Sequence, residues 1–194
     1  MTLIKSISGI RGTLENIPGE SLSDIDVQQF TLAYFQEIIL PQNNNRVVVG
    51  RDARKSGKKI SNIVSSTLSD QGCDVIDIGM VTTPTLGIYT KKIKASGGIM
   101  ISASHNDERW NALKLLNSSG EFLSPKNVEL VIRDEIRKKT EVKKPGNIVK
   151  HDKALDYHID LILSQKILMT DKIKKRNFKI AVDGINSVGG VALP

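Results

Sequence analysis

A short polar segment, Ser102-Ala-Ser-His-Asn106, directly follows the apolar run Gly98-Ile-Met-Ile101. Such a run predicts a buried strand, so the hydroxyl of Ser104 would stand on rigid backbone and still face solvent, which suits a nucleophile or a phosphate carrier. Backbone N–H groups in this kind of turn can also bind a phosphate. Serine and asparagine equally favour ordinary turns, so the segment alone leaves a turn-capping role open.

Two glycine-containing segments hold the arginines that a phosphate site needs. Arg11 stands between two glycines in the segment Ser6-Ile-Ser-Gly-Ile-Arg-Gly12. The backbone can approach a ligand closely there, and a guanidinium binds phosphate oxygens in pairs, although a plain surface arginine is the alternative. Arg51 lies in Gly50-Arg-Asp-Ala-Arg-Lys-Ser-Gly57, whose alternating charges favour an ion-pair network that orients the loops over direct contact with a substrate.

Two further side chains are candidates for proton transfer. His105 could serve as an acid, a base or a hydrogen-bond donor to phosphate, or it could be an ordinary loop histidine. Lys114 interrupts the apolar run Ala112-Leu-Lys-Leu-Leu116 and faces either solvent or the same crevice as Ser104. Each of these residues has an alternative without a catalytic role, so only their convergence at one place would indicate a site.

Strand and helix patterns alternate along the first part of the chain. Apolar runs ended by glycine or polar turns predict strands at residues 47–49, 74–78, 98–101 and 112–116. Amphipathic runs predict helices at residues 60–68 and 83–92, from Ser23 to about Leu40, and from Ser124 to Ile136. This order predicts an α/β fold, a three-layer α/β/α domain with a mainly parallel mixed sheet. Ligands of such sheets bind beyond the carboxyl ends of the strands, where we expect the polar segments to meet.

The domain predicted in this way spans residues 1–140. Lysine, proline, glycine and asparagine at residues 141–152 predict a linker. Residues 153–194 predict the incomplete start of a second, similar domain, with a helix at about 153–168 and a strand at Phe178-Lys-Ile-Ala-Val182. We therefore expect the chain to be the N-terminal fragment of a longer protein.

Composition excludes several classes of function. Residues 133–179 carry 14 lysines and arginines against 7 acidic residues, which accounts for the whole net charge of +7, but few aromatic side chains accompany them. Solvated helix faces therefore explain this charge better than nucleic-acid binding, and no apolar run is long enough to cross a membrane.

The single cysteine, Cys73, suits a reducing compartment, so we expect a cytoplasmic protein. The sequence contains no Gly-x-Ser-x-Gly elbow, no P-loop and no cysteine and histidine set with metal-ligand spacing.

Four segments in order resemble the α-D-phosphohexomutase superfamily. They are Gly9-Ile-Arg-Gly12, Gly50-Arg-Asp-Ala-Arg-Lys-Ser-Gly57, Ser102-Ala-Ser-His-Asn-Asp107 and Leu113-Lys114. Within the superfamily, the start of the chain, Met1–Thr13, and the segment Arg109–Leu116 are most similar to the bacterial phosphoglucosamine mutases. The resemblance covers the predicted first domain and the opening of the second.

The resemblance implies a phosphoserine enzyme that moves phosphate between C1 and C6 of a hexose phosphate through a bisphosphate intermediate. Ser104 would carry the phosphate and bind Mg²⁺ through a phosphate oxygen. Arg11 and Lys114 would neutralise charge or assist proton transfer, and His105 would complete the catalytic set. The implied substrate contacts are Ser8, Gly9, Asn106 and Arg51. Nucleic acid and membranes are not expected partners.

Two residues depart from the superfamily's pattern. Asp107 replaces the usual proline of the serine loop and adds a negative charge that should oppose phosphate unless Arg109 or a metal offsets it. Ala112 stands where many members have glycine. The superfamily's Asp-x-Asp-x-Asp-Arg metal loop, its sugar-reading loop and its C-terminal phosphate-binding domain would all follow Pro194, so we expect no turnover from these 194 residues alone. The alternatives are a phosphoglucomutase or phosphomannomutase, or a non-catalytic sugar-phosphate-binding module.

Overall fold

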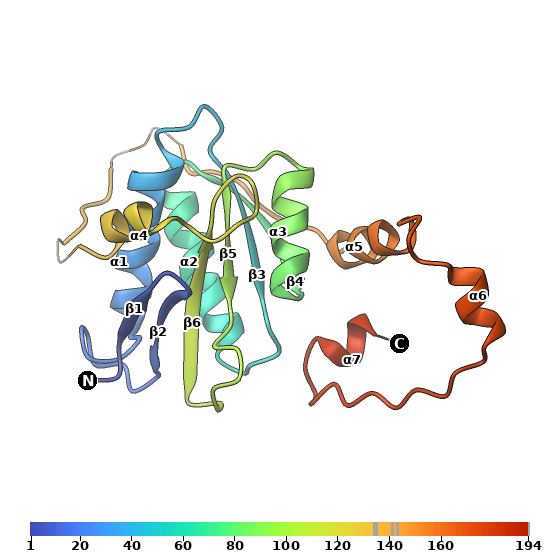
Figure 1. The fold of residues 1–194 in the computed structure, drawn as a ribbon. Helices are drawn as coiled ribbons and strands as arrows, with labels where there is room; N and C mark the ends of the chain where they lie inside the picture. Colours follow the sequence, from blue (N-terminus) through green and yellow to red (C-terminus); the bar gives the residue numbers. More distant parts are fainter. Residues whose placement is uncertain (134–135, 141, 143, 194) are drawn as a thin grey trace.

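The computed structural model of the protein describes residues 1–133, 136–140, 142 and 144–193. A seven-stranded sheet lies at its centre, in the order β1-β2-β6-β5-β3-β4-β7, with helices on both faces (Figure 1). The strands are β1 (Ile4–Ser6), β2 (Gly9–Thr13), β3 (Arg46–Arg51), β4 (Asp74–Met80), β5 (Gly97–Ile101), β6 (Trp110–Leu116) and β7 (Ile148–Lys150). The helices are α1 (Asp24–Tyr34), continued by the π-helix η1 (Phe35–Ile39), α2 (Gly57–Asp70), α3 (Thr83–Lys92), α4 (Pro125–Val131), α5 (Ala154–Leu163), α6 (Thr170–Lys175) and α7 (Gly189–Ala192).

The sheet is mixed, as the sequence predicts. Strands β5, β3, β4 and β7 are parallel to one another, whereas β1, β2 and β6 join by antiparallel pairing. Side chains alternate along β3, since Val47 and Val49 belong to one buried cluster and Val48 belongs to the other. A strand whose successive side chains enter two cores is buried on both faces, which explains its uninterrupted run of valines.

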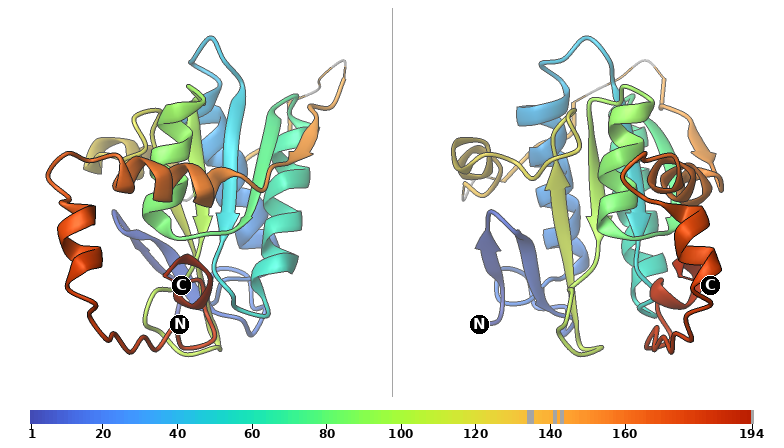
Figure 2. Two further views of the ribbon diagram at one scale, coloured as in Figure 1. Left: turned by 90° about the vertical axis from the view of Figure 1, so that its right-hand side faces the viewer. Right: turned by 45° about the vertical axis from the view of Figure 1, so that its right-hand side comes forward.

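Helices cover the two faces unequally. The larger core lies between the sheet and α1, α2 and α4, and the smaller one between the sheet and α3 and α5 (Figures 1 and 2). This arrangement confirms the predicted three-layer α/β/α fold. Parallel β3 and β5 both end at the edge of the sheet where the Ser102–Asn106 segment begins.

Local capping signals place most helix starts correctly. Ser23 and Asp26 form the expected capping box of α1, in which Ser23 accepts from the Asp26 amide and Asp26 accepts from the Ser23 amide. Ser124 caps α4 by accepting from the amide of Asn127. Helix α4, however, ends at Val131, and Ile136, predicted to lie on its apolar face, is 88% exposed. The predicted extension of that face to Ile136 was therefore wrong.

The C-terminal region differs most from its prediction. Residues 148–150, which the sequence places in a linker, form β7 and extend the sheet beside β4. The strand expected at Phe178–Val182 does not form, and these residues lie in irregular, exposed structure. A strand needs a neighbouring strand to pair its backbone groups, and the described residues offer none there. After α5 the chain runs outside the three layers (Figure 2). No helix in the described part of the chain is long and apolar enough to cross a membrane.

Candidate active site

The loop between β5 and β6 presents the hydroxyl of Ser104 to solvent. Ser104 adopts a left-handed backbone conformation with φ of 56°, which costs a non-glycine residue about 1–3 kcal/mol. Its amide donates to Oγ of Ser102 at 3.2 Å, and the amide of Asn106 donates to the carbonyl oxygen of Ala103 at 3.1 Å. An uncommon conformation at an exposed hydroxyl, held by hydrogen bonds on both sides, is typical of a functional loop.

Pairing of β5 with β6 brings Lys114 to this hydroxyl. Met100 lies opposite Lys114 in the antiparallel register, so the lysine stands beside the end of the strand that leads into the loop. Nζ of Lys114 donates to Oγ of Ser104 at 2.6 Å. Burial lowers the pKa of Lys114 from its ordinary value, although the charge of Asp52 opposes this shift. Lys114 therefore faces the crevice, and the alternative that it merely faces solvent is wrong.

Pairing of β2 with β6 brings Arg11 to the same face of the sheet. Arg11 lies opposite Ala112, and side chains directly opposite and two residues along an antiparallel pair share one face, which places Arg11 beside Lys114. Gly9 makes this close pairing possible. Its φ is +130°, and a Cβ there would lie 2.7 Å from the carbonyl oxygen of Leu113. Any residue with a Cβ at position 9 would push β2 away from β6 and the site.

A hollow of about 240 Å³ lies between these elements. It is lined by Ser8, Gly9, Arg11, Ser102, Ala103, Ser104, Ala112, Lys114 and Phe122. Among these described residues two side chains are cationic and none is a carboxylate. The Nε of Arg11 is buried and has no hydrogen-bond partner among the described residues. A buried, unpartnered guanidinium N–H beside an ammonium group favours an anionic ligand such as a phosphoryl group.

Of the other predicted site residues, some line this hollow and some do not. Gly9 lines it, and Ser8 lines it too while its hydroxyl lies 3.0 Å from that of Ser6. His105 and Asn106 belong to the same loop, but neither is among the described residues that line the hollow. Arg51 lines a separate space of about 790 Å³ between β4, α2 and the C-terminal region. The roles of these residues in binding or catalysis stay predictions.

Four residues that line the hollow were not predicted as site residues from the sequence: Ser102, Ala103, Ala112 and Phe122. Ser102 and Ala103 belong to the same loop motif as Ser104, and Ala112 lies opposite Arg11. Phe122 comes from the turn after β6, where it pairs with Leu116. Nothing in the sequence around Phe122 signals a site, because only the return of the chain onto β6 brings the ring there.

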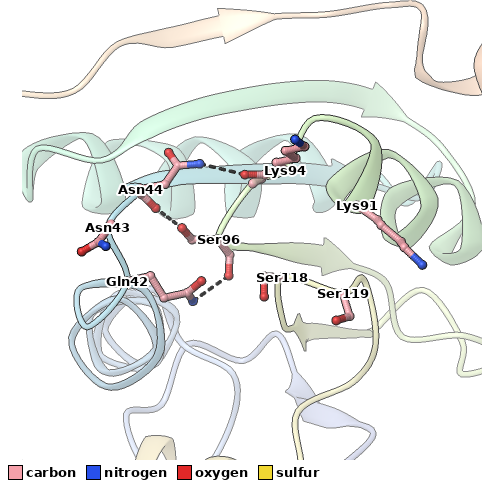
Figure 3. A pocket seen from close by; sticks show the side chains of 9 residues that line it. Gln42, Asn43, Asn44, Lys91, Lys94, Ser96, Ser118 and Ser119 are labelled. Carbon is pink, nitrogen blue, oxygen red and sulfur yellow. Dashed lines mark hydrogen bonds between the residues drawn. The ribbon is translucent and has the colours of Figure 1, made fainter.

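A larger hollow at the opposite end of the sheet has a different character. It lies before β3 and β5 and after β6, and it has a volume of about 330 Å³ (Figure 3). Its polar groups bond to one another: Gln42 donates to the carbonyl oxygen of Ser96 at 2.9 Å, and Asn44 donates to that of Lys94 at 2.7 Å (Figure 3). These contacts tie the strand starts together, so size alone does not identify the site.

Asp107, the departure from the superfamily's proline, is paired. Nη2 of Arg109 lies 2.6 Å from Oδ2 of Asp107, and the amide of Arg109 donates to Oδ1 at 2.9 Å. Hydrogen bonds from Arg109 hold the pKa of the Asp107 carboxyl below its usual range. The offset of this charge by Arg109, one of the two conditions expected from the sequence, is therefore met in the structure.

The described residues do not supply a complete Mg²⁺ site. They contain no group of three or more histidine, cysteine, aspartate or glutamate side chains close enough to hold a metal. Of the acidic side chains at the loop, Asp52 and Asp107 are each bound by an arginine, and Glu108 is exposed with Nζ of Lys55 3.9 Å away. A phosphate on Ser104 would add one oxygen ligand. The described residues therefore do not fit Mg²⁺ as a bound cofactor.

The fold and site define a class: a three-layer α/β/α domain with a serine loop at the carboxyl ends of its parallel strands and two cationic side chains that line the same hollow as the hydroxyl. Residues 4–143 match the model of the phosphoglucomutase/phosphomannomutase alpha/beta/alpha domain I. The chain therefore belongs to the phosphoglucomutase/phosphomannomutase family, as the sequence predicts.

Curated relatives and solved structures agree with this assignment. The chain is 44% identical over 113 residues to the probable phosphoglucosamine mutase of Methanosphaera stadtmanae, a match that covers 58% of the chain and 24% of that protein. It is 34% identical over 166 residues to the phosphoglucosamine mutase of Methanococcus maripaludis, covering 84% of the chain and 35% of that protein. The phosphoglucomutase parafusin of Paramecium shares the fold with a TM-score of 0.74 at 16% identity, over 99% of the chain and 41% of that structure. The chain thus spans about a quarter to a third of the length of these curated relatives.

Proposed function

We propose that this chain provides the phosphate-carrying domain of a phosphosugar mutase, which moves phosphate between C1 and C6 of a hexose phosphate. Ser104 carries the phosphoryl group in this proposal. The observation that carries it is the 2.6 Å hydrogen bond from Nζ of Lys114 to Oγ of Ser104, beside the unpartnered Nε of Arg11 in a hollow lined by cations. Phosphoryl transfer depends mainly on positioning and charge stabilisation, and this arrangement supports both.

The proposed transfer uses these groups in two directions. When phosphoserine gives its phosphoryl group to a sugar hydroxyl, the bond from phosphorus to Oγ of Ser104 breaks as the bond to the sugar oxygen forms. The proton that leaves the sugar hydroxyl is balanced by the proton that Lys114 delivers to Oγ. The N–H of Lys114 stabilises the negative charge that develops on Oγ, and Arg11 stabilises the transferring oxygens. In the return transfer from the bisphosphate, the bond from phosphorus to the sugar oxygen breaks and the bond to Oγ of Ser104 forms. The hydroxyl of Ser104 loses its proton, and the released sugar oxygen takes one up. Lys114 is placed to accept the proton of Ser104, since burial favours the neutral amine.

The substrate is proposed from the relatives, because the chain covers only part of their length. Two of them are named phosphoglucosamine mutase, which favours a hexosamine phosphate, and a Thermococcus kodakarensis relative is named phosphoglucomutase/phosphomannomutase. The sugar-reading groups and the metal ligands would come from regions of such relatives that this chain does not match. We expect the 194-residue chain alone to show no interconversion of hexose 1- and 6-phosphates, and a measured turnover would overturn that expectation.

Intact-mass analysis tests the carrier role directly. The purified chain is incubated with glucosamine 1,6-bisphosphate and compared with a Ser104→Ala variant treated in the same way. We expect the unaltered chain to gain the mass of one phosphoryl group, peptide mapping to place it on Ser104, and the variant to gain none. An unmodified chain, combined with measurable binding of the bisphosphate, would favour the non-catalytic sugar-phosphate-binding module instead.

A further inference from the structure

Arg54, in the segment after β3, makes an unusually complete set of contacts with the serine loop. Its Nε donates to Oδ2 of Asp52 at 3.1 Å. The other four N–H groups donate to backbone carbonyl oxygens of the loop: those of Ser104 at 3.0 Å, Asn106 at 2.6 Å, Asp107 at 2.5 Å and Trp110 at 3.3 Å. A guanidinium has five N–H donors, so every one of them is used.

Asp52 holds the side chain of Arg54 in the orientation in which it contacts the loop. Oδ1 of Asp52 accepts from the Arg54 amide at 3.0 Å, while Oδ2 accepts from Nε, so one carboxylate holds both ends of the residue. The amide of Asp52 donates to the carbonyl oxygen of Ile101 at 3.0 Å, which anchors this turn to the end of β5. The side chains of Asp52 and Arg54 are each only 13% exposed. The pair therefore stands on two adjacent parallel strands as a rigid support.

The loop needs such support because its backbone is strained where the chemistry would occur. Ser104 has a φ of 56°, and its side chain and that of His105 are exposed, so packing does not hold them. The carbonyl oxygens that Arg54 binds begin at Ser104 itself and continue through the turn. An arginine can reach four such oxygens with a planar fork of donors, whereas a lysine has three donors at one point.

We propose that Arg54 is a positioning residue, which holds the backbone of the 104–110 loop so that Oγ of Ser104 stays in line with Lys114 and Arg11. The proposal rests on the phosphate-carrying function proposed above. Arg54 has no N–H left for a substrate, so it acts through the loop and makes no contact with the sugar phosphate.

The test compares the Arg54→Lys variant with the unaltered chain in two independent measurements. The first is amide hydrogen exchange at Asn106 and Trp110, whose amides bond within the loop. The second is the rate of Ser104 phosphorylation over a range of glucosamine 1,6-bisphosphate concentrations. We expect exchange to rise and the maximal rate to fall, each by about tenfold or more, because charge-assisted hydrogen bonds are lost. The half-saturating bisphosphate concentration should stay unchanged.

A matched control removes a neighbouring positive charge. Lys55 is 95% exposed, and its Nζ lies 3.9 Å from the carboxylate of Glu108, a contact too exposed to hold the loop. We expect the Lys55→Ala variant to match the unaltered chain in both measurements. Asp52→Asn serves as a second test variant should Arg54→Lys fail to fold, and it should produce the same changes in a smaller degree.

The outcomes separate the two proposals. Exchange and maximal rate equal to those of the unaltered chain in folded Arg54→Lys would sink the positioning role. A raised half-saturating concentration with an unchanged maximal rate would also overturn it, since that pattern belongs to a substrate contact. If the unaltered chain binds the bisphosphate but takes up no phosphate, the proposed function fails. The exchange measurement then decides by itself whether Arg54 holds the loop.

Discussion

Two runs of β-branched and aromatic residues have opposite fates in this molecule. Val47, Val48 and Val49 are fully buried in β3, whereas Phe178 and Ile180 are 65% and 78% exposed and form no strand. The strand β3 lies between β5 and β4, which pair with both of its edges. The later run has no neighbour among the described residues. An apolar run therefore becomes a strand only where neighbouring strands pair with its backbone N–H and C=O groups.

The largest expected effect on the free energy of unfolding comes from truncating a buried side chain of the domain, compared with an exposed one of the C-terminal region. Leu68 is fully buried in the core between α2 and the sheet, so we expect Leu68→Ala to lower the free energy of unfolding by about 2–5 kcal/mol. Ile180→Ala, at an exposed position, should change it by less than about 0.5 kcal/mol. Urea denaturation followed by circular dichroism measures both. A cost at Ile180 similar to that at Leu68 would mean that the C-terminal region is packed in solution.

Two glycines test the same difference in packing between the domain and the C-terminal region. A Cβ on Gly97 would collide with the Tyr34 hydroxyl, which donates to the carbonyl oxygen of Leu116 at 2.6 Å. We expect Gly97→Ala to cost about 1–3 kcal/mol through overpacking. A Cβ on Gly190, in α7, would meet nothing within 4 Å, so Gly190→Ala should be neutral. Thermal unfolding of the two variants checks this, and equal melting temperatures would contradict the tight contact at Gly97.

Cys73 offers a pH test of burial in the domain. Burial raises the pKa of its thiol from 9.0 to about 12. The folded state then holds the proton more tightly than the unfolded state, so this contribution to stability is complete below pH 9 and is lost as pH rises from there. We expect a loss of about 1 kcal/mol between pH 9 and 10. The Cys73→Ala variant should lack that component, and identical alkaline profiles for the two proteins would argue against a buried thiol.

The smallest effect should follow from removing the exposed C-terminal region. Helix α5 contacts α3 through the smaller core, but the residues after it are mostly exposed. A chain ending at Leu163 should therefore melt within about 2 °C of the full chain. Limited proteolysis should cut the full chain first between residues 164 and 188. A large fall in melting temperature would show that this region stabilises the domain.

The candidate site was predictable in its parts and less so in its assembly. The apolar strand before Ser104 and the glycines around Arg11 indicate both residues without a structure. The face to which Lys114 points was open until the register of β6 with β5 and β2 decided it. The sequence also suggested an ion-pair network in the Gly50–Gly57 segment, but it could not show that Arg54, and not Arg51, reaches the serine loop.

The sequence alone determined the features that depend on residues close together in the chain. The capping box of Ser23 and Asp26, the alternation along β3 and the position of the serine loop after an apolar strand all depend on a few neighbouring residues. Only the tertiary structure decided the contacts that make a site. Arg54 bonds to Trp110 across 56 positions, and Lys114 meets Ser104 because two antiparallel strands lie in one register. Such contacts depend on which segments pair, and no local pattern contains that information.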